Sequence, residues 1–339
     1  MNAVQRLPLP GEPYRTNAVE ISLNAAVLSI DHDAPCFLTV PRQNDVKNGI
    51  ALPSGPFVPS DHMTLDNGLR SWVLEQTGVE LGYLEQLYTF GDQPLPNLPG
   101  HNDKHIISLG YMALTRAKPD DAAEGRHWLA AYDFLPWEDW RDGKPEILAQ
   151  QIEPHLRDGL TSGSYQTNAG EHRGERLERL RIAFGLDGAA WDEERVLERY
   201  ELLQDAGLLA DPNGGSPVTP ARKGALSLTA AAMSFAHRRI LASALGRLRA
   251  KIKYRPVLFE LMAGEFTLFE LQRTVEAILG SRLHKQNFRR LVESGGLVDP
   301  TTDIRTHTGG RPAKLFRFRR EVLLERPAPG VRVRAGLAA

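Results

Sequence analysis

The segment that decides the fold reads Arg282-Leu283-His284-Lys285-Gln286-Asn287-Phe288-Arg289-Arg290-Leu291-Val292. Positions 283, 288, 291 and 292 are apolar and fall roughly on one side of a helix, which predicts an amphipathic helix over 282–294. Gly295 and Gly296 follow directly and can end that helix. We expect the apolar side to pack on its own domain and the opposite side to face solvent or a partner.

The flanking segments predict how this helix is held. Thr267 can cap a helix over 268–279, and Gly280 can end it. Upstream, Pro256 breaks a longer helix, and a short helix follows over 257–262. Downstream we expect a short strand at 297–298, a polar loop over 299–310 and a strand over 313–318. Three short helices and a β-ribbon in so short a stretch indicate a winged helix-turn-helix.

The polar side of the 282–294 helix has the residue types that read DNA. Arg and Lys can pair with guanine in the major groove, and Gln or Asn can pair with adenine. The glycines of the loop over 299–310 let its tip approach a sugar-phosphate backbone, where basic residues can bind phosphate. The sequence therefore predicts DNA contacts from Lys285, Gln286, Asn287, Arg289, Arg290, Arg311 and Lys314. The alternative is an ordinary solvated amphipathic helix.

Charge is distributed unevenly along the chain. The net charge is −1, but residues 237–320 hold eighteen Lys+Arg against seven Asp+Glu. Of the chain totals of 41 and 42, this leaves 23 Lys+Arg against 35 Asp+Glu elsewhere. A basic region gathered in this way is typical of phosphate binding. A protein-interaction module that binds no DNA is a second interpretation, and the salt dependence of binding would separate the two.

The region before residue 158 predicts an α+β domain. Strands are expected over 19–30, 36–40, 84–90, 105–114 and 128–134, with helices over 64–76 and 144–157. Thr64 is the expected cap of the first helix and Gly78 its end. An exposed linker over 158–170, two helices over 172–186 and 191–209, and a long helix over 225–253 follow.

Several strings resemble the Nudix-related transcriptional regulators of NAD metabolism. They include His237-Arg238-Arg239-Ile240-Leu241, Tyr254-Arg255-Pro256-Val257-Leu258-Phe259-Glu260-Leu261, Lys285-Gln286-Asn287-Phe288-Arg289-Arg290 and Gly310-Arg311-Pro312-Ala313. The resemblance is dense over 237–318 and thin before it. It implies an N-terminal Nudix-like α/β/α sandwich over 1–157, a helical insert and linker over 158–253, a C-terminal winged helix-turn-helix over 254–326 and a tail over 327–339. It also implies a repressor of NAD-biosynthesis genes.

The box that gives Nudix hydrolases their activity is depleted here. Aligning its last glycine with Gly78 puts Trp72, Glu75 and Gln76 at the three glutamate positions nearest that glycine and Met63 at the upstream one. Only Glu75 is a carboxylate. One carboxylate cannot hold the divalent cation that such hydrolysis requires. We therefore expect no metal and no catalytic residue, and no cofactor is required. The alternative is a Nudix-type pyrophosphohydrolase with an appended nucleic-acid-binding module.

A Nudix-like cleft without these carboxylates can still bind a nucleotide. The resemblance implies an effector such as NAD, ADP-ribose or ATP, with contacts from Arg42, Asn44, Arg70, Trp72, Lys104 and His105. We hypothesise a homodimer whose two winged helices bind the half-sites of a palindromic double-stranded operator. Cys36 is the single cysteine, which excludes an intramolecular disulfide. With no signal core and no long apolar run, we expect a cytoplasmic protein without a membrane partner.

Overall fold

The computed structural model describes residues 19–31, 33–42, 49–91, 105–116, 127–162, 173–209, 233, 235–254, 257–306 and 312–319. Within these residues a 7-stranded sheet has the order β3-β2-β1-β6-β5, with β4 paired to β1 and β7 to β2. Its strands are β1 (Val19–Asp31), β2 (Ala34–Pro41), β3 (Ile50–Ala51), β4 (Ser54–Pro56), β5 (Tyr83–Phe90), β6 (His105–Leu114) and β7 (His127–Ala130). The central pair, β1 and β6, is parallel.

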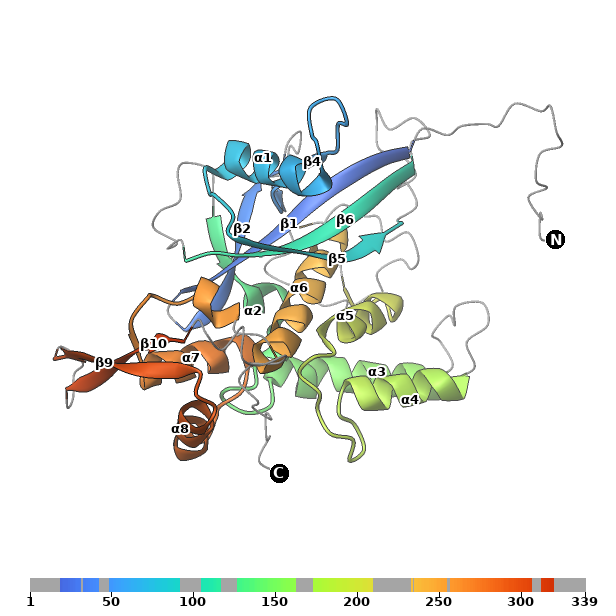
Figure 1. Ribbon diagram of the computed structural model, residues 1–339. Coiled ribbons are helices and arrows are strands. Elements are labelled where there is room, and N and C mark those ends of the chain that lie inside the picture. Colours follow the sequence, from blue (N-terminus) through green and yellow to red (C-terminus); the bar gives the residue numbers. More distant parts are fainter. Residues whose placement is uncertain are drawn as a thin grey trace.

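The two faces of this sheet are covered by different helices. Alternate β1 residues point to opposite sides, so Leu23 and Val27 belong to one apolar cluster and Ala26 and Leu28 to another. Helix α1 (Leu65–Thr77) packs on the first side, and the long helix α6 (Phe235–Tyr254) packs on the second (Figure 1). This is the α/β/α arrangement expected from the sequence.

The ends of α1 follow from the chemistry of its caps. Thr64 accepts a hydrogen bond from the Asn67 amide, and Gly78 takes the left-handed conformation at φ 62°. The expected strand over 128–134 is wrong beyond Ala130, because the chain turns there into α2 (Ala131–Phe134). Its buried side chains recur at helical spacing and pack beneath the sheet rather than in it.

A set of helices connects the sheet to the C-terminal region. These are η2 (Pro136–Glu138), the π-helical turn η3 (Leu148–Ile152), α3 (Glu153–Ser162), α4 (Arg173–Ala183) and α5 (Val196–Asp205). The two insert helices expected from the sequence are confirmed, with shorter bounds. The linker expected from residue 158 is wrong at its start, because α3 continues to Ser162; the preceding turn of helix is anchored by the fully buried Leu156.

Helix α6 begins later than the sequence pattern predicts. Met233 forms a parallel bridge with Ile50 at the sheet edge, so it is not helical, and the helix starts at Phe235. The rest of the expected stretch before it lies outside the described residues. Among the helices that the structure describes, none is both long enough and apolar enough to span a membrane.

The C-terminal region is a winged helix. It consists of η4 (Val257–Glu260), β8 (Phe266–Thr267), α7 (Leu268–Leu279), α8 (Lys285–Ser294), β9 (Val298–Arg305) and β10 (Ala313–Phe318). The strands form a sheet of order β8-β10-β9. The expected bounds of α7 and β10 are confirmed, and a capping box between Thr267 and Glu270 starts α7.

Other bounds in this region differ from the prediction. The short helix expected over 257–262 ends at Glu260, and the strand expected at 297–298 starts at Val298. Helix α8 starts at Lys285 rather than 282, because His284 has an extended backbone at ψ 116°. The loop expected over 299–310 is wrong for 299–305, where β9 pairs with β10. Pro300 is tolerated in this strand because β9 lies at the edge of its sheet.

One apolar core joins the two regions. A single cluster runs from the α6 side of the large sheet, through α4, α5 and α6, to Leu271 in α7 and Phe288 in α8. The winged helix is therefore packed against the rest of the chain and shares its apolar core (Figure 1).

Candidate nucleic-acid interface

Helix α8 is docked by its apolar side. Phe288 and Val292 are 1% and 0% exposed, and Leu283 and Leu291 pack partly buried against the core. Lys285, Gln286, Asn287, Arg289 and Arg290 are all exposed. Among the residues that the structure describes, no carboxylate forms an ion pair with the three cations of this set. The helix thus presents a row of free donors on the side away from the core.

The turn before α8 is held by a carboxylate of α7. Glu276, 4% exposed, accepts hydrogen bonds from the Leu283 amide at 3.0 Å and from Gln272 at 2.8 Å. Arg282 lies 3.3 Å from the same carboxylate. Gly280 takes the left-handed conformation at φ 67°, which lets the chain reverse here. The start of α8 is therefore fixed relative to α7.

The β9–β10 hairpin forms the wing. Lys314 is exposed, whereas Arg311 lies outside the described residues. Phe318 packs between Phe259 and Phe266, with ring centroids 4.2 and 4.5 Å away, so it belongs to the core of the winged helix. Arg317 alternates with it and is exposed, which adds a cation to the same strand that was not among the predicted DNA contacts.

The basic residues of α6, unlike those of α8, contact other segments of the chain. Arg239 pairs with Glu201 at 2.6 Å, Lys251 with Glu85 at 2.8 Å, and Lys253 with both Glu193 and Glu194 at 2.6 Å. Arg249 is fully buried against Glu138. Much of the positive charge counted over 237–320 is thus neutralised inside the chain. A count of charges along a sequence does not reveal this, because the acidic partners lie in other segments.

The residues predicted for a nucleotide lie at separate places. Arg70 binds Asp66 at 2.7 Å and donates to the carbonyls of Leu81 and Gly82. Arg42 is close enough to His237, in the first turn of α6, for its charge to act on that imidazole. Asn44 and Lys104 lie outside the described residues, as does the side chain of His105.

Two side chains of α1 fasten the helix to β4. The Trp72 indole donates to the Pro56 carbonyl at 2.9 Å and packs against Gly55, where a Cβ would lie 2.3 Å from the ring. The Gln76 amide both accepts from and donates to the backbone of Ser54, at 3.1 and 2.6 Å. Two of the four side chains that the sequence alignment assigns to Nudix-box glutamate positions therefore hydrogen-bond the backbone of β4. Within the described ranges, no group of three His, Cys, Asp or Glu side chains is placed to hold a metal.

His237 links this part of the sheet to α6. Its Nδ1 accepts a hydrogen bond from the Leu52 amide at 3.0 Å. Burial, helped by the positive charge of Arg42, lowers the pKa of His237 to about 4. The imidazole is therefore neutral at physiological pH, as its acceptor role requires.

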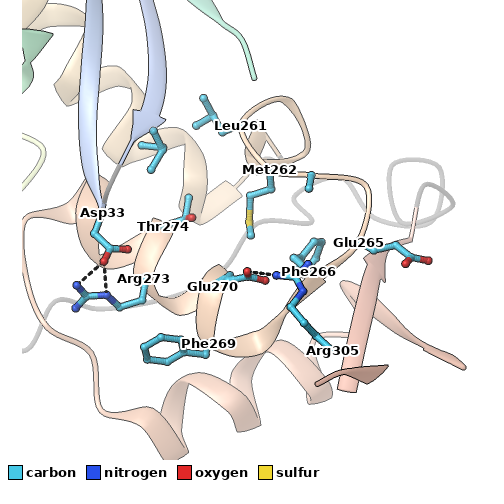
Figure 2. A pocket seen from close by; sticks show the side chains of 12 residues that line it. Asp33, Leu261, Met262, Glu265, Phe266, Phe269, Glu270, Arg273, Thr274 and Arg305 are labelled. Atoms are coloured by element: carbon cyan, nitrogen blue, oxygen red, sulfur yellow. Dashed lines mark hydrogen bonds and ion pairs between the residues drawn. The ribbon is translucent and has the colours of Figure 1, made fainter. Parts of the chain in front are cut away.

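A cavity of about 420 Å³ lies between the β1–β2 hairpin and the winged helix. Figure 2 shows its two charged contacts. Asp33, at the hairpin turn, binds Arg273 of α7 at 2.6 Å, and Glu270 pairs with Arg305 of β9. No sequence pattern indicated the contact between Asp33 and Arg273, because the two residues are 240 positions apart in the sequence.

Comparisons with known proteins agree with this architecture. The family model of the NrtR DNA-binding winged helix domain matches residues 258–318. The ADPR responsive transcriptional repressor NtrR of Acinetobacter baylyi is 41% identical over 86 residues, which are 25% of this chain and 34% of that protein. The chain thus spans about a third of the length of the curated relative it matches.

A solved structure extends the likeness over the rest of the chain. Shewanella oneidensis NrtR in complex with a 27mer DNA superposes with a TM-score of 0.51 at 18% identity, covering 89% of this chain and 94% of that one. At this identity the likeness concerns the fold. The chain therefore has the fold of NrtR, a Nudix-like domain followed by a winged helix, and its C-terminal segment is a winged helix of the NrtR type.

Proposed function

We propose that this chain is a cytoplasmic transcriptional repressor of NAD-biosynthesis genes that binds DNA through α8 and is controlled by a nucleotide. The exposed polar side of α8 carries the proposal, because it offers three cations without an intramolecular partner among the described residues. These donors suit phosphates and base edges of the major groove. The Acinetobacter relative is named as a transcriptional repressor, which supports the same function.

The DNA contacts in this proposal come from α8 and the wing. They are Lys285, Gln286, Asn287, Arg289, Arg290, Arg311 and Lys314. We propose that two chains form a homodimer on a palindromic operator, so that each α8 enters one half-site. The division of labour is a sensing domain over 1–157, an insert and linker over 158–253, a DNA-binding domain over 254–326 and a tail over 327–339.

ADP-ribose is the first effector to test, because the Acinetobacter relative is named as responsive to it. NAD and ATP share its nucleoside diphosphate and are the alternatives. The proposed contacts are Arg42, Asn44, Arg70, Trp72, Lys104 and His105. Arg70 and Trp72 already donate hydrogen bonds to backbone carbonyls, which holds both side chains in place. A ligand would therefore contact a fixed guanidinium group at Arg70 and the packed indole ring at Trp72.

The contacts of helix α1 argue against hydrolysis. Trp72 and Gln76 use two of the box positions to bind β4, which leaves the exposed Glu75 as the one carboxylate there. A divalent cation usually shares several carboxylates. A Nudix-type pyrophosphohydrolase is the second candidate function, and turnover of ADP-ribose or NAD in the presence of Mg²⁺ would establish it.

The test of the proposal is operator binding by the full chain. Fluorescence anisotropy with the promoter of a NAD-biosynthesis operon is measured with and without ADP-ribose, NAD and ATP. We expect sequence-specific binding that one nucleotide changes. Arg289→Ala with Arg290→Ala should abolish it while the melting temperature stays unchanged. Arg247→Ala in α6 is the matched control and should bind normally. Binding that survives the double substitution would contradict the assignment of α8.

A further inference from the structure

A buried charge cluster lies between the helices that follow the large sheet and the C-terminal end of α7. Glu138 of η2, Arg199 of α5 and Arg249 of α6 are each 0% exposed. The Glu138 carboxylate binds Arg199 at 2.6 and 2.9 Å and Arg249 at 2.6 Å. Burial alone would raise the pKa of Glu138, but the two guanidinium groups hold it below its usual value. The carboxylate is therefore ionised and fixed by both arginines.

The side chains around this cluster complete the end of α7. A helix leaves its last carbonyls without an intrahelical partner. Here the Tyr132 hydroxyl donates to the Ala277 carbonyl at 2.5 Å, and Arg249 donates to the Ile278 carbonyl at 2.9 Å. The Trp140 amide donates to the Gly280 carbonyl at 2.6 Å. All three donors come from outside the winged helix.

Gly280 touches the cluster directly. A Cβ at this position would lie 2.3 Å from the Glu138 carbonyl, 2.8 Å from Arg249 and 3.0 Å from the Tyr132 hydroxyl. The turn that begins at Gly280 leads into α8 at Lys285. The C-terminal end of α7, five residues before α8 begins, is therefore packed against η2 and α2.

The segment that supplies these contacts continues directly from the large sheet. β7 pairs with β2 and ends at Ala130, where α2 begins. Tyr132 and Glu138 follow β7 closely in the sequence, so a displacement of β7 along the sheet would move both residues. No flexible linker among the described residues separates the two.

We infer that residues 131–140, rather than the winged helix alone, set the direction of α8. A displacement of the large sheet would change the direction of α8 through this segment. Tyr132 and Trp140 of this segment are positioning residues for DNA recognition, since they act on α8 through the end of α7. Arg249 of α6, which binds Glu138 of the segment, acts in the same way. This inference rests on the proposed function only in that DNA is what α8 binds.

The contact at the cavity is the rival route. Asp33 and Arg273 also join the sheet to α7, but their side chains are 43% and 27% exposed. Exposed ion pairs contribute little because water and salt screen them. The buried hydrogen bonds of Tyr132 and Arg249 have no such competition from water. We therefore assign the main coupling to residues 131–140.

The experiment compares Tyr132→Phe with Tyr111→Phe in the full chain. Tyr132→Phe removes the hydroxyl that binds the Ala277 carbonyl and keeps the ring. Tyr111→Phe is the matched control, because its hydroxyl contacts Gln86 at 3.4 Å on the α1 side of the sheet. The readouts are amide hydrogen exchange over 281–288, operator affinity, ADP-ribose affinity and the effect of ADP-ribose on operator affinity.

Tyr132→Phe should speed hydrogen exchange over 281–288 and weaken operator binding by about three- to tenfold, as loss of one buried hydrogen bond predicts. It should reduce the effect of ADP-ribose on the operator while ADP-ribose affinity stays unchanged. Tyr111→Phe should leave the exchange over 281–288 and the operator affinity unchanged. Asp33→Asn, which tests the rival route, should change both by less than about twofold.

Wild-type exchange over 281–288 in a folded Tyr132→Phe variant would overturn the inference, as would a larger effect of Asp33→Asn than of Tyr132→Phe. The exchange measurement needs no DNA. It therefore still tests the role of residues 131–140 if the wild-type chain fails to bind the operator, which would contradict the proposed function instead.

Discussion

Helices α6 and α8 are both rich in Arg and Lys, yet they use these residues in opposite ways. In α6, Arg239, Lys251 and Lys253 pair with acidic residues of the sheet and the insert, and Arg249 is fully buried against Glu138. In α8 the cations are exposed and meet no carboxylate among the described residues. The positive charge of α6 holds the chain together, whereas that of α8 is available to a partner. The difference lies in the neighbours of each helix and not in its composition.

The largest expected effect is on stability and concerns the buried arginine of α6, Arg249. Glu138→Gln removes the carboxylate that pairs with both Arg199 and Arg249, the one acidic partner of these arginines within the described ranges. Breaking a buried pair leaves an uncompensated charge and should lower the free energy of unfolding by about 3–5 kcal/mol. Urea denaturation followed by circular dichroism measures it.

Glu201→Gln is the control for this prediction. Its partner Arg239 is 27% exposed and Glu201 itself 32%, so the loss should stay below about 1 kcal/mol. Equal losses in the two variants would mean that burial does not distinguish the ion pair of Arg249 from that of Arg239.

A smaller effect is expected in the salt dependence of operator binding. Each phosphate contact contributes about 0.9 to the slope of log affinity against log salt. Single substitutions Lys285→Ala, Arg290→Ala and Lys314→Ala should each reduce the slope of the full chain by up to this amount. Lys251→Ala in α6 should leave it unchanged, because that ammonium binds Glu85 at 2.8 Å. A reduced slope for Lys251→Ala would place α6 at the DNA as well.

The smallest effect concerns a surface contact of α6. Arg247 lies over the ring of Tyr88 at 5.9 Å, and Tyr88 is 50% exposed. An exposed cation–π contact of this kind contributes about 0.5–1 kcal/mol. Arg247→Ala should therefore lower the free energy of unfolding by no more than that in a thermal melt. A clear loss of stability beyond this range would show that Arg247 has a further partner.

Local signals in the sequence predicted the elements whose ends are chemically marked. Thr267 and Gly280 bound α7, and Thr64 and Gly78 bound α1, because a cap acts within one turn of its own helix. The burial of Phe288 and Val292 followed from helical spacing alone. The exposed DNA-contact residues of α8 stay a prediction, since exposure does not identify a partner.

Features that depend on distant segments were not predictable in this way. Strand β9 extends to Arg305 because β10 pairs with it, although its own residues read as a polar loop. Helix α2 interrupts an apparent strand because Tyr132 and Phe134 pack into a core built from later segments. The internal neutralisation of α6 and the Asp33–Arg273 pair have the same origin.

The order of the segments has a consequence for synthesis of the protein. β1 is made first, but Ala26 and Leu28 lie in the core on the side that α6 covers, and α6 ends at Tyr254. At typical rates of about 5–20 residues per second, this apolar side stays uncovered for roughly ten seconds or more after β1 leaves the ribosome. The nascent sheet therefore exposes an aggregation-prone surface until most of the chain has been translated.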